Sequence, residues 1–141
     1  MRSLIDAIEK VLSEHPDLSN VVVRAYGPTY EIPESIPYVN IIPRAKLRER
    51  QFFIGTNISY DVKPEVELHI WQASLDNLRT AFGKCEDLAE TVLSILAGVS
   101  AAELNVYHHE SSIESYEDMH YELTYYYAAV IVLKAAKDES Y

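Results

Sequence analysis

The stretch Glu65-Val66-Glu67-Leu68-His69-Ile70-Trp71 decides the fold of this chain. Its aliphatic residues alternate with polar ones, which is typical of a β-strand with one buried face. An apolar stripe at helical spacing follows over about six turns. Its members are Leu75, Leu78, Phe82, Cys85, Leu88, Ala89, Val92, Leu93 and Leu96. A strand that runs straight into a long amphipathic helix predicts a sheet with a helix packed on it.

The ends of this helix carry residues that commonly cap helices. Ser74 or Asp76 can accept a hydrogen bond from the first turn, and Gly98 stands where a terminating glycine belongs. We therefore expect the helix to cover residues 76–96.

A second helix is predicted at the start of the chain. Five apolar residues recur there at helical spacing: Leu4, Ile5, Ile8, Val11 and Leu12. Ser3 and Asp6 form a candidate capping box. Pro16 ends the helix, because a residue that precedes proline is disfavoured in helical geometry. The pattern therefore predicts a helix over residues 4–12.

Two strands are predicted between this helix and residue 65. Residues 21–26 and 38–42 are rich in β-branched and aromatic side chains, and residues 27–37 between them contain three prolines. Pro43 marks the second strand as an edge or an end, because proline has no N–H to donate to a ladder. Residues 27–37 are expected to form a loop.

The last third predicts two further strands. Residues 104–108 form one arm, residues 119–134 form the other, and residues 109–118 form a polar linker. Ala128, Val130 and Val132 make the second face of the longer strand apolar as well, so we expect this strand to touch its own domain or a neighbour on both faces. The order of helix, three strands, helix and two strands predicts a single α+β domain over residues 1–141. An antiparallel or mixed sheet would pack against the two helices, with a long hairpin arm between the second and third strands.

The composition limits the classes of function. The net charge is −10 and the isoelectric point about 4.8, which disfavours binding to nucleic acid and to anionic membranes, although a halophilic origin gives the same balance. The single cysteine excludes an intrachain disulfide framework. The longest apolar runs are far below the roughly 20 residues that a membrane helix needs. We expect a protein of the cytoplasm.

Catalytic motifs are missing from the sequence. It contains no glycine-rich phosphate loop, no GxSxG and no HExxH. Cys85 lies on the apolar stripe, where a thiol packs as a small hydrophobe. His108, His109 and Glu110 could form a zinc or nickel site with His120 if the last two strands pair. Adjacent histidines on a strand point to opposite faces, so solvated polar residues are the favoured interpretation.

Carboxylates and tyrosines also cluster without a catalytic pattern. The pairs Glu114/Glu117 and Glu65/Glu67 are interpreted as exposed charge rather than as an acid–base pair. Base stacking on the clustered tyrosines would need a basic groove, whereas acidic residues accompany them, so a core or interface role is favoured. These tyrosines are Tyr121, Tyr125, Tyr126 and Tyr127. We therefore predict no enzyme activity, no cofactor and no metal site.

The most unusual segment follows the second strand. Four of the twelve basic residues are Arg44, Lys46, Arg48 and Arg50, and an extended backbone would place them on one face. A solvated hairpin tip is the plain interpretation. Phe52, Phe53 and Ile54 follow directly, however, and are too apolar for such a tip. A basic and aromatic arm on a chain of net charge −10 fits the acidic surface of another copy, so these seven residues are the predicted subunit interface.

The element order, the length and the long hairpin resemble the tail terminator proteins of long-tailed bacteriophages, also called tail-completion or tail-to-head joining proteins. The likeness is carried by the helix at residues 4–12 and by residues 66–71, a strand that ends in tryptophan before the helix at residues 76–96. The closing strand at residues 121–133 also matches. The resemblance spans most of the chain, but the acidic stretch at residues 111–118 has no counterpart in the family.

This resemblance implies a virion structural protein of the tail or neck. Members form hexameric rings that cap the tail tube, stop its elongation and present a docking surface to the head connector and neck proteins. DNA passes through the lumen without specific binding, which suits an acidic protein. The arm at residues 44–54 would contact a neighbour or the last ring of tube protein, and ring closure needs two different patches to meet. The protein would occur in the virion, and in the host cytoplasm during assembly.

Two rival functions make different predictions. A homo-oligomeric small-molecule-binding or regulatory module would have an enclosed pocket and form a stable dimer. An enzyme that uses His108, His109 and His120 would be purified with stoichiometric metal.

Overall fold

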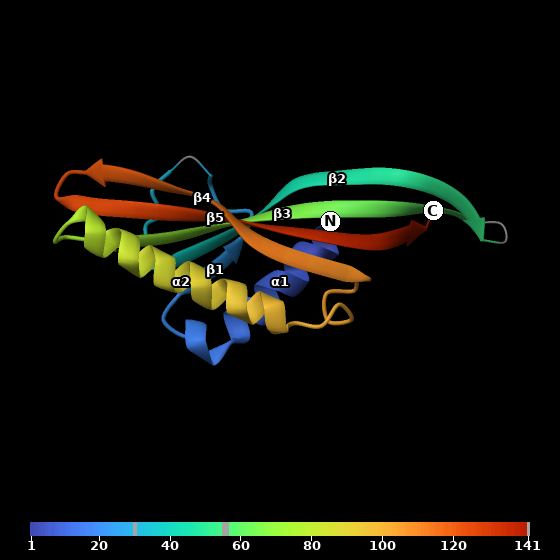
Figure 1. Cartoon of the computed structure of the whole chain (residues 1–141), viewed down its shortest axis with the longest axis horizontal. Coiled ribbons are helices and arrows are strands. Elements are labelled where there is room, and N and C mark those ends of the chain that lie inside the picture. Colours follow the sequence, from blue (N-terminus) through green and yellow to red (C-terminus); the bar gives the residue numbers. More distant parts are fainter. Residues whose placement is uncertain (30, 55–56, 141) are drawn as a thin grey trace.

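Over the residues that it describes, the computed structural model has two α-helices and a five-stranded mixed sheet (Figure 1). It describes the backbone of residues 1–29, 31–54 and 57–140, and the side chains of these residues except 45–54, 57–61 and 138–140. The elements are α1 (Arg2–Glu14), a 3-10 turn (Pro16–Leu18), β1 (Val22–Ala25), β2 (Tyr38–Ile54), β3 (Asn57–Ser74), α2 (Leu78–Gly98), β4 (His108–Tyr121) and β5 (Thr124–Ser140). The predicted α+β class and element order are confirmed.

The strands lie in the order β1-β2-β3-β5-β4. β1 runs parallel to β2, and the other neighbours are antiparallel. β2 and β3 form the expected long hairpin, and its outer half extends beyond both helices (Figure 1). Pro43 does not end β2. β1 pairs with β2 only as far as Ile41, so proline at position 43 removes no ladder hydrogen bond to β1.

Both helices cover the same face of the sheet (Figure 1). The alternation that defines the central strand is confirmed, because Val66, Leu68 and Ile70 are fully buried beneath the helices. α1 contributes four buried residues: Leu4, Ile5, Ile8 and Leu12. On α2 the Phe82 ring packs edge-on against Tyr116 of β4 and Tyr127 of β5, with centroid distances of 5.1 Å to each. These aromatic contacts fasten α2 to the last hairpin.

The helix starts differ from the predictions. α2 begins at Leu78, and Asn77 caps it by accepting a 2.8 Å hydrogen bond from the Thr80 N–H. Ser74 caps the preceding turn instead, where its hydroxyl accepts from the Asp76 N–H. Leu75 lies in this turn and is 74% exposed, so its assignment to the apolar stripe is wrong.

α1 lacks the capping box expected at Ser3 and Asp6. Ser3 is already inside the helix, whose cap position is Met1 and has no side-chain cap hydrogen bond. A capping box needs its first residue outside the helix, so a helix that starts earlier than predicted cannot form one at these positions.

The polar linker expected at residues 109–118 is wrong, because these residues belong to β4. β4 is the last strand of the sheet as described, and its residues alternate between exposed and half-buried up to Ile113. Charged residues are common on such strands because they oppose edge-to-edge aggregation. A two-residue turn, Glu122-Leu123, joins β4 to β5, with Glu122 at φ 55°.

Candidate assembly surface

The predicted interface residues all lie on β2, in the hairpin arm (residues 44–54 and their partners on β3). They are Arg44, Lys46, Arg48, Arg50, Phe52, Phe53 and Ile54. The side chain of Arg44 is described, and those of the other six lie outside the described residues. Register shifts between Pro43 and Ala45 and between Arg48 and Arg50 interrupt the two-residue period of β2. The side chains of Lys46, Arg48 and Arg50 lie outside the described residues, so the placement of the four basic residues on one face stays a prediction.

Arg44 makes a bidentate ion pair within the chain. Its guanidinium donates hydrogen bonds of 2.9 and 3.1 Å to the two carboxylate oxygens of Glu114. This hydrogen-bonded carboxylate raises the pKa of Arg44, and Glu67 and Glu65 add to the effect from β3. The planar fork of arginine fits a carboxylate in this geometry and fixes both side chains in one orientation. The basic residue closest to the root of the arm is therefore engaged inside its own subunit.

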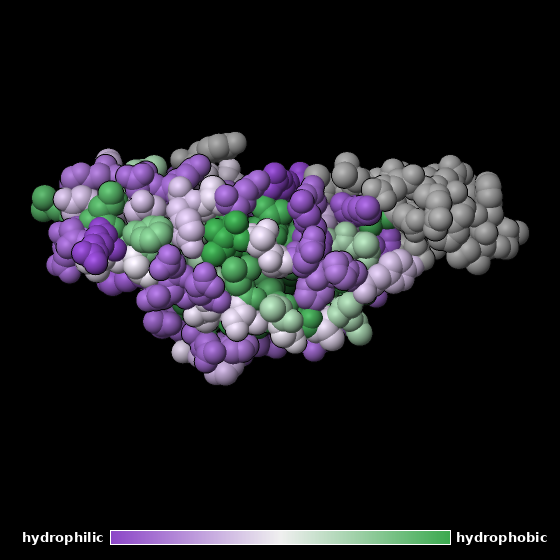
Figure 2. Space-filling view, viewed as in Figure 1, coloured by the Kyte–Doolittle hydropathy of each residue, from purple (hydrophilic) through white to green (hydrophobic). Residues whose placement is uncertain are grey.

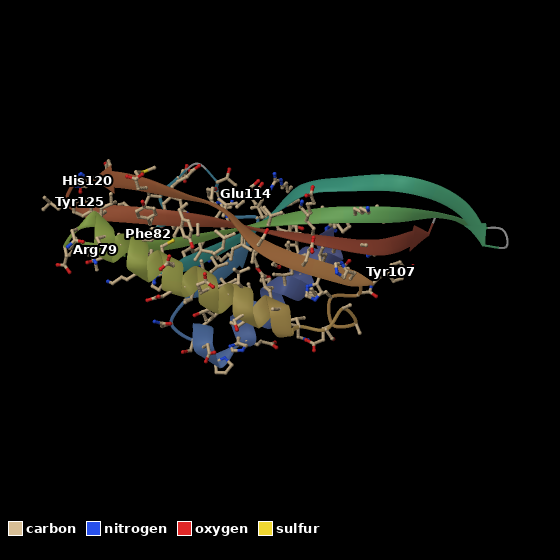
Figure 3. The ribbon with its side chains drawn as sticks, in the orientation of Figure 1. Arg79, Phe82, Tyr107, Glu114, His120 and Tyr125 are labelled. Carbon is tan, nitrogen blue, oxygen red and sulfur yellow. The ribbon has the colours of Figure 1, made fainter. Side chains whose placement is uncertain are left out.

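Both partners of this ion pair sit at irregularities in their strands. Arg44 falls in the register shift between Pro43 and Ala45, and Glu114 falls in the shift between Ile113 and Ser115. Bulges of this kind re-aim a side chain. β3 and β5 separate β2 from β4, so the ion pair spans these two strands. Glu65 and Glu67 act on Arg44 and alternate with the buried Val66 and Leu68, so the pair lies on the face of the sheet opposite the helices, which we call the open face. Figure 3 labels Glu114 where β4 crosses the other strands.

Three of the carboxylates that resembled acid–base pairs, those of Glu65, Glu67 and Glu114, contact nitrogen atoms of other side chains instead. Glu67 lies 3.2 Å from His69 on the same strand, and Glu65 lies 3.9 Å from Lys134 of β5. Glu114 belongs to the pair with Arg44, so it does not meet Glu117 as an acid–base pair would. These contacts favour a structural role for the open face.

β5 is buried on both faces at Ala128 and Val132, whereas Val130 between them is half-buried. Ala128 and Val132 are only 8% and 4% exposed on the open face, where they lie between β3 and β4. The contact that the sequence predicted for this face is therefore made within the subunit.

One end of the open face is covered by the loop at residues 27–37. Asn40 of β2 is 1% exposed and holds this loop with three hydrogen bonds. Its Oδ1 accepts from the Gly27 N–H at 2.8 Å, and its Nδ2 donates to the carbonyls of Gly27 and Pro28 at 3.0 and 3.3 Å. A Cβ at position 27 would come too close to the Tyr38 hydroxyl and the Asn40 amide oxygen, so a larger residue would require these side chains to shift.

The histidines do not meet. His108 and His109 begin β4 and His120 lies near its end, roughly 35 to 40 Å away at about 3.3 Å per residue. His109 Nε2 lies 2.7 Å from the Val99 carbonyl oxygen, and His120 stacks on Tyr125 at 4.4 Å, as Figure 3 shows. The described part of the chain holds no group of three or more side chains suited to a metal ion. The structure therefore does not bring His108, His109 and His120 together as the alternative metal site requires.

Cys85 lies in the core as predicted. It is fully buried, and its thiol donates a weak hydrogen bond to the Ile70 carbonyl at 3.5 Å. Burial raises the pKa of the Cys85 thiol to about 12. A thiol with this pKa stays protonated at neutral pH and is a poor nucleophile.

The sequence pattern did not reveal an apolar tip at the end of the β4–β5 hairpin. Leu123 is 82% exposed, Tyr121 57% and Met119 46%, and Leu75 from the β3–α2 turn lies beside them. Leu75 and Leu123 both occupy turns between elements. This tip lies at the opposite end of the molecule from the arm (Figure 1).

A shallow depression lies between α1, its following turn and the second half of α2. It has a volume of about 600 Å³, is open to solvent and is lined partly by Val11, His15, Glu90 and Glu103. Figure 2 shows hydrophilic side chains over much of the α2 side, with apolar atoms reaching the surface near the middle. Within the described residues, no helix is both long and apolar enough to span a bilayer.

Comparisons with solved structures find chains of similar fold. A solved structure of the virion of a native gene transfer agent particle contains a chain that is 12% identical, with a TM-score of 0.42 and 94% of both chains covered. No family model matches the sequence, and no curated protein matches it. We therefore base the functional proposal on the residues and the element order of this chain.

Proposed function

We propose that this chain is a virion structural protein of a phage tail or neck. It forms a homo-hexameric ring that caps the tail tube, ends tail elongation and joins the tail to the head connector. The observation that carries the proposal is the hairpin arm, which holds a third of the basic residues of an acidic chain on strands that extend beyond both helices. An arm of this kind supplies one patch of a heterologous interface, and the acidic body supplies the other.

The role is structural rather than catalytic. Several of the side chains that could have carried chemistry contact other groups of the chain: Glu65, Glu67, Glu114, His109 and His120. The acidic surface disfavours tight binding to the phosphates of DNA that passes through the ring. We expect the partners to be further copies of the chain, the tube protein and the connector.

The arm is tested by removing its charge. Arg44 is left intact because it pairs with Glu114, and Lys46, Arg48 and Arg50 are replaced with serine. The control replaces three exposed basic residues of the helices, Arg2, Arg79 and Lys84, so that both triple variants have a net charge of −13. Native mass spectrometry and negative-stain imaging report assembly. We expect the arm variant to stay a folded monomer and the control to form rings.

The specific role is tested with tail tubes of the same virus. Wild-type protein should bind one end of each tube and prevent further addition of tube subunits. A wild-type protein that forms only a stable dimer, and that leaves tube elongation unchanged, would favour the homo-oligomeric small-molecule-binding or regulatory module instead.

A further inference from the structure

The edges of the sheet differ in whether the chain protects them from pairing with another strand. At one edge, β1 has only four residues, and the Glu9 carboxylate of α1 accepts a 2.7 Å hydrogen bond from the Ala25 N–H. A side chain bonded to an outward-facing backbone group prevents another strand from pairing there. This edge is therefore protected by the chain itself.

Two further strand edges, that of β4 and that of the outer part of β2, are long and carry opposite charges. β4 forms the far edge of the sheet as described, and its 14 residues include Glu110, Glu114, Glu117 and Asp118 but no lysine or arginine. The outer part of β2 forms the other edge, because β1 does not continue beside it. Residues 44–54 there contain four basic residues and one acidic residue.

The hairpin turn shows which backbone groups of β4 face outward. Tyr121 pairs with Thr124 across a two-residue turn, so these two residues exchange hydrogen bonds. Inward and outward N–H groups alternate along an antiparallel strand, so the N–H groups of Met119 and Glu117 also point toward β5. The N–H groups of His120, Asp118 and Tyr116 point away from the sheet, where they can accept a further strand.

We propose that the outer part of β2 in one copy pairs with the β4 edge of the next copy, so that the sheets join edge to edge around the ring. This inference rests on the proposed ring and specifies how its subunits meet. A copy related by rotation about an axis roughly along the strands places β2 antiparallel to the β4 that it joins, because direction alternates from β2 through β3 and β5 to β4.

The register sets the offset between neighbours. Arg50 lies level with Asp138 of β5, through Asp61, whereas Glu117 lies level with Ala128. The outer part of the arm is thus further along the strand direction than Glu117, whereas Ala45 at its root is level with Glu110. Pairing the two edges requires successive copies to be staggered along the strands. The strands are then inclined to the ring axis, as in closed β-barrels.

A proline substitution tests the backbone part of the interface. Asp118→Pro removes an outward N–H but no hydrogen bond of the β4–β5 ladder, so the monomer should fold. Asp118→Ala removes the same charge and keeps the N–H. We expect Asp118→Pro to weaken self-association by roughly tenfold or more relative to Asp118→Ala, as loss of a backbone hydrogen bond does. Equal association of the two variants, measured by sedimentation, would overturn strand pairing at this position.

A charge exchange tests the partner assignment. One variant carries Lys46→Glu and Arg48→Glu, and the other carries Glu117→Lys and Asp118→Lys. Each alone brings like charges together at every interface and should not assemble. In an equimolar mixture, every arm can meet an edge of opposite charge, so rings that alternate the two variants should form. A mixture that stays monomeric, although each variant is folded by circular dichroism, contradicts the proposed pairing.

The wild-type protein separates the two proposals. If it forms no ring alone or on tail tubes, the proposed function fails. If it forms rings but neither the proline nor the charge exchange changes them, the ring stands and edge pairing is wrong.

Discussion

The substitution Asn40→Asp tests whether the buried amide of β2 holds the loop at residues 27–37. An aspartate has the same shape and can still accept the Gly27 N–H, but it cannot donate to the carbonyls of Gly27 and Pro28. It also places a charge at a position that is 1% exposed, beside those two carbonyl oxygens. Two lost hydrogen bonds and a poorly solvated charge together lower the free energy of unfolding by about 3 kcal/mol at pH 7.

This loss should depend on pH. Burial and the neighbouring carbonyls favour the protonated form, so the carboxyl at position 40 has a higher pKa in the folded than in the unfolded state. The variant therefore binds a proton more tightly when folded, and its deficit relative to wild type shrinks as the pH falls from 7 toward 4. Once protonated, the carboxyl can donate one hydrogen bond again.

Thermal and urea unfolding followed by circular dichroism measure the effect. A change of about 3 kcal/mol corresponds to a fall in Tm of about 10 °C for a domain of this size. The exposed substitution Asn20→Asp adds the same charge and should change the stability by less than about 0.5 kcal/mol. If Asn40→Asp is as stable as Asn20→Asp at pH 7, the amide does not hold the loop.

Three further substitutions test the packing of α2. Asn77→Ala removes the helix cap and should destabilise the protein by about 1 kcal/mol in urea, whereas Asp76→Ala should have little effect. Phe82→Ala removes both edge-on ring contacts and should cost about 2 to 3 kcal/mol by the same assay. Because the pKa of Cys85 is about 12 when folded and near 9 when unfolded, wild type should lose up to about 1.4 kcal/mol of stability per pH unit above pH 9, relative to Cys85→Ala. The native thiol should also resist alkylation at pH 8, and rapid labelling would contradict its burial.

The sequence predicted those elements whose periodicity matches their burial. In residues 66–70 apolar and polar side chains alternate strictly, and the apolar ones are fully buried beneath the helices. The two-residue period of the sequence therefore matches the burial of one face of the strand. In α1 and in the buried part of α2, the apolar residues recur at helical spacing and these residues are the buried ones. Cys85 was placed correctly because its spacing matched the buried stripe.

β4 was missed because composition is a weak guide to an edge strand. Its outer side needs no apolar residues, and negative charge there protects the monomer, so the segment resembled a loop. The Arg44–Glu114 pair could not be predicted either. Seventy residues separate the partners in sequence, and both are positioned by bulges that single-sequence patterns do not reveal.

Salt should act on assembly in two opposite ways. Residues 44–54 have a charge of +3, and the remaining 8 basic and 21 acidic residues give the rest of the chain a charge of −13. Repulsion between bodies acts over long distances and is already screened when the Debye length falls from about 30 Å at 0.01 M to about 10 Å at 0.1 M salt. Attraction between an arm and the β4 edge acts at contact, and strong screening requires a Debye length of about 3 Å, near 1 M salt.

Ring formation measured by sedimentation should therefore be greatest at intermediate ionic strength. Contacts made mainly by Phe52, Phe53 and Ile54 would instead strengthen steadily with salt, because screening removes the repulsion and leaves apolar burial intact. The Lys46→Glu and Arg48→Glu variant provides the internal comparison. Because its arm is no longer attracted to the β4 edge, this variant should not form rings at any ionic strength. A maximum in the wild type that is absent from this variant assigns the attraction to the charges of the arm.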